Sequence, residues 1–399
     1  MTRGRQTRAM AGLTLALALA SACELERLGG ASLAGDDAGS DAGAGGVFDD
    51  AGFGGTAGQA EAAVEAEAAT PLPYAYRRRL KLTPGATGVP AGASIRFEID
   101  HRALVLEGKA RADGEDLRLV FQGTGSSQEI HRVVDVASGW DRADTTLWFQ
   151  VQAPIGPEPG GVYYLYYGDA LADGALDDPR QVYAAFDDFS GSGVSPEWKG
   201  AVVGNAKGTF TVKGGVLRIE GTTGDIWNNS DDFLFLYRTL TGNFVAEARV
   251  SASGGSVSGW GKLGGVMVRA TTDKASMNRM IAPVNGSKAI TSSYRLGAGA
   301  TTDESAKNGA KLIPQVVRLA RRFDATRTWH SGDAIDYAEL GAEQTFQSPL
   351  PDTTLVGIPL ANLVAAPGWV EIDWFRAWRW YDDEPTLTLE PEEPGPFLP

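Results

Sequence analysis

From about residue 73 to residue 381 the sequence consists of short apolar runs separated by Gly, Asp, Asn and Pro, and this pattern restricts the fold most. Alternation is clearest in NFVAEARVS (243–251), where one strand face would carry Phe244, Ala246, Ala248 and Val250. Long helical periodicity does not occur, so a parallel α/β fold lacks its interleaved helices. The sequence therefore predicts an all-β protein with two β-sandwich (jelly-roll-like) domains.

Composition and motifs exclude several common functions. A net charge of −14 argues against nucleic-acid binding, which normally needs a basic face. The single cysteine excludes an intramolecular disulfide and a cysteine-based zinc site within one chain. The histidines lack H-E-x-x-H spacing, and neither the G-x-x-x-x-G-K-[ST] phosphate loop nor the G-x-S-x-G nucleophile motif occurs.

The N-terminus has the features of an export signal. Basic residues (1–8) precede a short apolar stretch (9–20) that is too short to span a bilayer, and small residues lead to Cys23. The segment 19–23, LASAC, resembles the bacterial lipobox, although Ala20 stands where the consensus has Leu. The resemblance implies cleavage before Cys23 and lipid attachment to it. An ordinary signal peptide (1–22) with an incidental cysteine is the alternative.

Acidic residues gather in the two flanks of the chain. Residues 24–70 hold ten acidic side chains and 382–399 hold six. The Gly/Ala/Asp-rich segment (23–72) has few large side chains to bury, so we expect a disordered spacer. The Pro/Glu-rich segment 382–399 is likewise expected to be a disordered tail.

A domain boundary is expected near 181–187, where a turn-rich segment follows the aromatic run YYLYYG (163–168). The preceding domain (73–184) contains Tyr76-Arg77, ADGEDLR (112–118), TLWFQV (146–151) and YYLYYGD (163–169). These phrases resemble the bacterial domain-of-unknown-function 2341 family. The resemblance implies an extracytoplasmic β module, in some relatives joined to subunits of proton-channel-type energy-transducing complexes. It transfers no catalytic residues. The DGED segment (113–116) is a predicted turn, with Ca²⁺ binding as the alternative.

The second domain (185–381) contains FDDFS (186–190), GVLRI (215–219), GNFVAE (242–247), WHSGD (329–333) and EIDWFRA (371–377). Together these resemble the concanavalin A-like lectin/glucanase superfamily, which implies two packed antiparallel sheets. Retaining glucanases of that superfamily carry Glu-x-Asp-x-x-Glu on one strand, because two carboxyls must flank the glycosidic bond. The nearest match ends in Arg376 instead of the second Glu. We therefore expect a protein that is not an enzyme.

Sugar binding needs exposed aromatic faces beside polar groups that satisfy hydroxyls. Loop-like segments of the second domain supply candidates of both kinds: Trp227, Asn228, Asn229, Trp260, Arg269, Tyr294, Arg295, Trp329 and His330. Packing in the core or at its rim is the alternative for each. If the first and last strands pair, a structural Ca²⁺ is a further hypothesis, held by Asp187, Asp188 and Asp373. No other cofactor is indicated.

Together these features predict a protein exported and lipid-anchored to the bacterial cell envelope, with non-catalytic binding of polysaccharide or another envelope component. The partners expected are therefore a glycan or envelope protein and, through the anchor, a membrane, but no nucleic acid. A scaffold or adaptor subunit of an envelope complex is the first alternative, and a degenerate glycoside hydrolase is the second.

Overall fold

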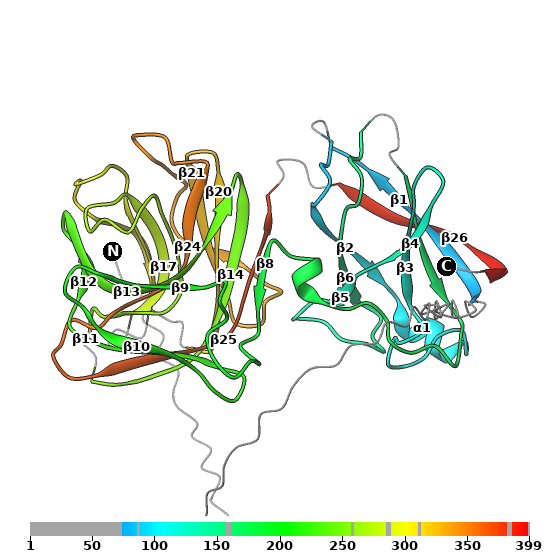
Figure 1. Ribbon diagram of the computed structural model, residues 1–399, viewed down its shortest axis with the longest axis horizontal. Helices are drawn as coiled ribbons and strands as arrows, with labels where there is room; N and C mark the ends of the chain where they lie inside the picture. Colours follow the sequence, from blue (N-terminus) through cyan, green and yellow to red (C-terminus); the bar gives the residue numbers. More distant parts are fainter. Residues whose placement is uncertain are drawn as a thin grey trace, which may run out of the picture. The chain divides into compact units, whose positions relative to one another are not determined.

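The computed structural model describes residues 74–85, 88–156, 161–256, 259–284, 289–309, 313–380 and 385–397. The expected signal peptide, Cys23 and the expected spacer lie outside the described residues. No helix within the described ranges has the length and apolar character needed to cross a membrane. The prediction of an all-β sandwich fold is confirmed: the strands form four sheets (Figure 1), and the described part holds one short α-helix.

The first sandwich consists of two antiparallel sheets, of five and three strands. The larger has the order β26 (Thr386–Phe397), β1 (Tyr74–Thr83), β7 (Val162–Tyr167), β3 (Arg118–Gln122) and β4 (Ser127–Ile130). The smaller has the order β2 (Ser94–Ile99), β6 (Thr145–Gln150) and β5 (Arg132–Val134). Helix α1 (His101–Leu106) follows β2, and the 3₁₀ helix η1 (Pro179–Gln181) ends this part of the chain.

Period-two alternation places one face of each sheet in the core of the first sandwich. In β2, Ile95 and Phe97 are buried against Leu147 and Phe149 of β6, whereas the intervening Arg96 points outward. The predicted turn is present: Gly114 has a φ of +70°, and Asp113 accepts a hydrogen bond from the backbone N–H of Glu115 (3.1 Å).

The prediction of a disordered C-terminal tail is wrong for Thr386–Phe397, which form β26 at the edge of the five-stranded sheet. Leu387 and Leu389 alternate with exposed threonines and pack against the first core. The glutamates meet a basic neighbour: Glu393 pairs with Arg77 of β1 (2.7 Å). The edge position also tolerates the prolines of this strand, which cannot donate to a second neighbour. The composition of this segment was therefore misleading, because the opposite charge is supplied by Arg77, which is 316 residues from Glu393 in the sequence.

The second sandwich consists of two antiparallel sheets of nine strands each. One has the order β10 (Lys207–Val212), β11 (Leu217–Thr222), β25 (Gly368–Arg379), β14 (Phe244–Gly255), β20 (Gln315–Arg322), β21 (Ala325–Ser331) and β22 (Ala338–Glu339), with β8 (Ala185–Asp187) beside β25 and β23 (Gln344–Thr345) beside β21. We call it the inner sheet.

The other sheet of the second sandwich has the order β12 (Asp225–Trp227), β13 (Ser230–Thr241), β24 (Thr353–Ala361), β15 (Lys262–Leu263), β17 (Asn278–Val284), β18 (Ala289–Arg295) and β19 (Asp303–Asn308), with β16 (Val266–Arg269) pairing β17 and β24, and β9 (Lys199–Val203) beside β13. The core between the two sheets is the largest of the molecule.

The alternation predicted for 243–251 is confirmed, because the core of the second sandwich includes Phe244, Ala246, Ala248 and Val250. The opposite face of β14 is also covered: Val245 and Glu247 are buried. The cover comes from the outer face of β2, β5 and β6, and the resulting apolar cluster includes Val133 and Trp148 from the first sandwich and Val245 and Trp378 from the second. The inner sheet is thus buried in part on both faces.

The packing of β26 can be tested by the substitution Leu389→Asn. Leu389 is partly buried against the first core, so its loss should lower the free energy of unfolding by about 1–2 kcal/mol in urea denaturation. Thr388→Asn is the control, since the neighbouring Thr388 is exposed. Equal, negligible effects of both substitutions would contradict a packed C-terminal strand.

Candidate functional site

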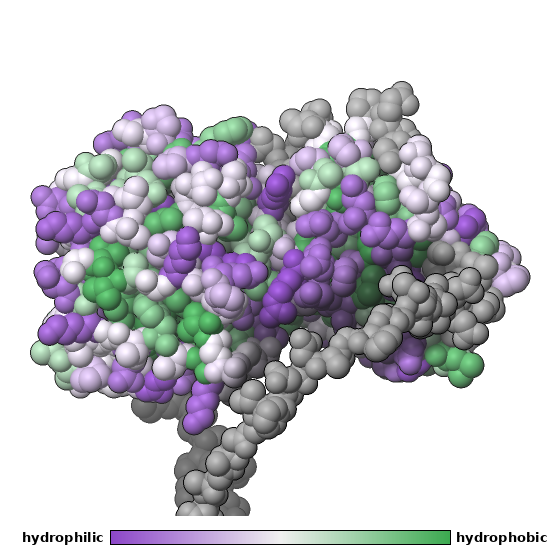
Figure 2. Space-filling model, viewed as in Figure 1, coloured by the Kyte–Doolittle hydropathy of each residue, from purple (hydrophilic) through white to green (hydrophobic). Residues whose placement is uncertain are grey.

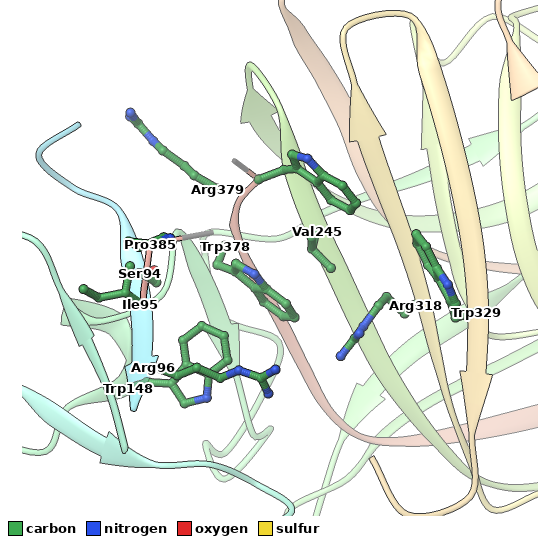
Figure 3. Close-up of a pocket in the computed structure, with 11 residues that line it drawn as sticks. Ser94, Ile95, Arg96, Trp148, Val245, Arg318, Trp329, Trp378, Arg379 and Pro385 are labelled. Carbon is green, nitrogen blue, oxygen red and sulfur yellow. The ribbon is translucent and has the colours of Figure 1, made fainter. Parts of the chain in front are cut away.

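A cavity of about 330 Å³ lies where the outer face of β2 and β6 meets the outer face of the inner sheet. The first sandwich contributes Arg96 and Trp148, and the second contributes Arg318, Trp329 and Trp378 (Figure 3). The remaining described lining residues are Ser94, Ile95, Val245, Arg379, Trp380 and Pro385. We call this space the Trp cavity.

Four tryptophans form two ring pairs in the wall of the Trp cavity. Trp148 of β6 and Trp378 of β25 are buried, with ring centroids 5.2 Å apart and an angle of 57° between the planes. Trp329 of β21 and Trp380 are half-buried and stacked, with centroids 6.3 Å apart at 24°. The buried indole Nε1 of Trp380 has no hydrogen-bond partner in the described part of the chain. The first pair joins the sandwiches, and the second leaves aromatic surface at the cavity.

Three arginines complete the polar side of the Trp cavity. Arg318 donates to Glu247 (2.5 Å) and lies over the ring of Tyr337, 3.4 Å from its centroid. Arg96 lies 5.8 Å from the ring centroid of Trp148. The side chain of Arg379 extends away from the tryptophans at the rim (Figure 3). The described lining residues therefore include three cations and no carboxylate.

Below the cavity, a buried ion network joins the two sandwiches through Arg376 of β25. Its guanidinium donates to Glu247 (2.7 Å) on the adjacent β14. It also donates to Asp135 (3.1 Å), which follows β5, and to the hydroxyl of Tyr183 (3.2 Å), which precedes β8. Asp135 also accepts from the indole Nε1 of Trp148 (2.5 Å). This network fixes the position of the tryptophan pair relative to both sheets.

The charges of the network support one another against the cost of burial. Burial alone would lower the pKa of Arg376, but Glu247, Tyr183 and Asp135 hold that pKa well above its ordinary value. Burial alone would raise the pKa of Glu247 and Asp135, but the arginines lower both. All three groups are therefore ions at neutral pH, and both carboxylates are occupied as acceptors.

Two further hollows adjoin the Trp cavity. A space of about 530 Å³ shares Arg96 and Arg318 with it and adds Glu98, Asp144 and Tyr337. A space of about 380 Å³ shares Trp380 with it and lies over the hairpin of β20 and β21. We call the three spaces together the groove. Each outer space is next to the Trp cavity, since it shares at least one lining residue with it.

Of the ligand candidates predicted from sequence, the structure places Trp329 in the groove. Arg269 and Arg295 instead lie buried on the other sheet, where both bind the carboxylate of Asp231 at 2.5 Å. Arg295 also donates to the backbone oxygen of Asn228 (3.1 Å). These arginines hold the start of β13 to β16 and β18.

The other candidates lie apart from the groove. Lys262 lies over the ring of Trp227 (5.1 Å), and Lys307 lies over the ring of the exposed Trp260 (4.1 Å). The hydroxyl of Tyr294 donates to Asp303 (3.4 Å). His330 is buried with its Nε2 3.2 Å from Asn308. The candidate Asn229 lies in the turn between β12 and β13.

The predicted calcium ligands do not come together. Asp187 accepts hydrogen bonds from the backbone of Phe189 and the indole of Trp198 (2.8 Å each). Asp188 accepts from Ser190, and Asp373 pairs with Arg249 (3.0 Å). In the described ranges no three acidic, histidine or cysteine side chains form a metal-binding group. The first and last strands do pair, but each carboxylate has separate partners: neutral donors of the segment after β8 for Asp187 and Asp188, and Arg249 of β14 for Asp373.

Sequence reasoning missed Arg96, Trp148, Trp378, Arg379 and Trp380. A signal was present in the alternation: Trp148 lies between the core residues Leu147 and Phe149 on β6, so it must face away from the core. Trp378 shares the outward face of β25 with Arg376 in the same way. Tryptophan on the outward face of a strand indicates that something covers that face.

No protein family and no curated protein matches the chain. The solved structures to which it is similar include a GH43 protein of Bacillus licheniformis (16% identity, TM-score 0.39, covering 59% of this chain and 47% of that one). They also include a GH16 endo-β-1,3(4)-glucanase (13%, 0.33, 49% and 90%) and a pseudo β-1,3-glucanase of Mycobacterium tuberculosis (13%, 0.33, 50% and 99%). The chain spans about half the length of the GH43 structures. With TM-scores of 0.33–0.39, the similarity assigns no activity to this chain.

These comparisons correct one expectation. The sequence predicted a protein that is not an enzyme, because Arg376 replaces the second glutamate of the glucanase motif. Glycoside hydrolases are nevertheless among the structures to which the chain is similar, so that prediction does not stand. The resemblance of 73–184 to the domain-of-unknown-function 2341 family stays a prediction.

The ion network can be tested by the substitution Arg376→Met. Loss of the guanidinium leaves Glu247 and Asp135 buried without their shared partner, which should cost about 3–5 kcal/mol in urea denaturation. Arg249→Met is the matched control on the adjacent strand, because its pair with Asp373 is partly exposed and should be worth less than about 1 kcal/mol. Similar losses in the free energy of unfolding for the two variants would contradict the idea that the buried network stabilises the packing of the two sandwiches.

Proposed function

We propose that the groove binds carbohydrate, with the Trp cavity as its principal subsite. The observation that supports this most is the stacked pair of Trp329 and Trp380, which presents aromatic surface beside Arg96 and Arg318. Sugar rings have apolar CH faces that pack on aromatic rings and hydroxyls that need hydrogen-bond partners. Indole surface beside guanidinium donors supplies both kinds of contact.

The construction of the site also favours binding with little rearrangement. Trp148 and Trp378 are held by the buried network of Arg376, so the cavity wall does not depend on loops alone. A preorganised wall reduces the side-chain entropy lost when a ligand binds.

The proposal is tested by the substitutions Trp329→Ala and Trp380→Ala. Each should weaken binding to soluble polysaccharides by about tenfold or more in affinity electrophoresis and titration calorimetry, a change of about 1.4 kcal/mol. Trp260→Ala is the control, since Trp260 is exposed but lies outside the groove. Release of reducing sugar is measured in the same samples, and hydrolysis that both groove variants lose would assign catalysis to the same groove.

Two outcomes would overturn the proposal. Loss of glycan binding in Trp260→Ala but not in the groove variants would place the site elsewhere. The adaptor alternative would be favoured by two results together. The wild-type chain binds no glycan, and it retains an envelope protein from solubilised membranes that the Trp329→Ala variant does not retain. Thermal unfolding of each variant separates lost binding from lost folding.

We also propose that the groove acts outside the cytoplasm, on a protein held to the cell envelope through Cys23. The support is the sequence of the first 23 residues, with a basic start, an apolar stretch and a lipobox-like end. Expression of Cys23→Ser in a bacterium should move the protein from the membrane fraction to the soluble exported fraction. Membrane association that survives this substitution would contradict lipid attachment at Cys23.

A further inference from the structure

We propose that the preferred ligand is an anionic polysaccharide, with a sugar carboxylate placed in the Trp cavity among its arginines. This inference rests on the proposed carbohydrate binding and adds the charge class of the ligand. The chain as a whole is acidic, with a net charge of −14, yet the described residues that line the Trp cavity include Arg96, Arg318 and Arg379 and no Asp or Glu. An excess of cations among the described lining residues favours an anionic ligand.

The arginines of the Trp cavity differ in how far they are already neutralised. Arg318 forms an ion pair with Glu247. Glu247 also pairs with Arg376, which pairs with Asp135 as well. For Arg96 and Arg379, by contrast, no ion pair with a described carboxylate occurs, although ion pairs hold most arginines of the outward face of the inner sheet. Arg96 and Arg379 are therefore the cations left to bind a ligand carboxylate.

Guanidinium suits this task because its planar donors match a carboxylate in two parallel hydrogen bonds. Arg96 comes from the first sandwich and Arg379 from the second. Because the side chain of Arg379 extends away from the tryptophans (Figure 3), it would contact a ligand chain where that chain leaves the cavity at the rim. Figure 2 shows hydrophilic residues gathered between β8 and β6 on the face in view. Arg96 and Arg379 are exposed, and a neutral glycan offers them no charged partner.

The adjoining hollows indicate a polymer and not a single sugar. The two outer spaces are lined by acidic and basic side chains together: Glu98, Asp135 and Asp144 with Arg96 and Arg318 in one, and Glu343 with Arg322 and Arg327 in the other. The described lining of the Trp cavity holds arginines without a carboxylate. A chain lying along the groove would therefore place its carboxylate at the centre and neutral parts on either side. This arrangement favours a polysaccharide in which acidic sugars are separated by uncharged sugars or uncharged parts of the chain.

The test compares two probes with one backbone: polygalacturonate and its fully methyl-esterified form. The full-length protein should bind the acid form at least tenfold more tightly in titration calorimetry, and the preference should decrease as NaCl rises from about 0.05 to 0.5 M. Alginate serves as a second polyuronate. The double variant Arg96→Gln/Arg379→Gln should lose the preference for the acid form while retaining weak binding to the ester.

The matched control is Lys213→Gln, which removes one positive charge from the exposed β10–β11 turn outside the groove and should leave the preference unchanged. Equal binding of ester and acid by the wild type would overturn this inference while leaving carbohydrate binding intact. Unchanged preference in the arginine double variant would also overturn it. Failure to bind every polysaccharide would instead overturn the proposed function itself.

Discussion

The arrangement of this protein depends on one buried cation. Arg376 donates to Glu247 on its own sheet and to Asp135 of the other sandwich, and all three side chains are buried. Buried charges are costly unless each has partners, so these residues strongly favour one way of packing the outer faces together. The tryptophan pair that lines the groove sits directly on this network, since Asp135 also binds the indole of Trp148.

The groove follows from that packing. Two sheets that each bury one face on their own core bring their outward faces together, and the side chains there do not close the space completely. Tryptophans on these faces would be unusual for a solvated surface, and they are explained once each wall is covered by the other. In this way a site forms between two scaffolds that separately resemble ordinary sandwiches.

Two segments show how far sequence reasoning extends. The alternation in β14 correctly identified Phe244 and Val250 as core residues, because the period of a strand is local. The same pattern puts Val245 and Glu247 on the opposite face but says nothing of what covers it, and another part of the chain buries them. For β26 the acidic, proline-rich composition predicted disorder. Its glutamates are neutralised by Arg77 and Lys109, which lie far away in the sequence and cannot be identified from the local composition.

The sequence by itself determined the all-β class, the alternating core positions and the turn at Gly114, because each depends on residues close together along the chain. Only the tertiary structure decided which outward faces meet, which arginines retain a carboxylate partner, and which tryptophans line a cavity. Arg269 and Arg96 illustrate the difference. Both are arginines on strands, but Asp231 neutralises the first in a buried cluster, and the second faces the groove without a described acidic partner. Pairing between distant segments sets that outcome, and local patterns carry no record of it.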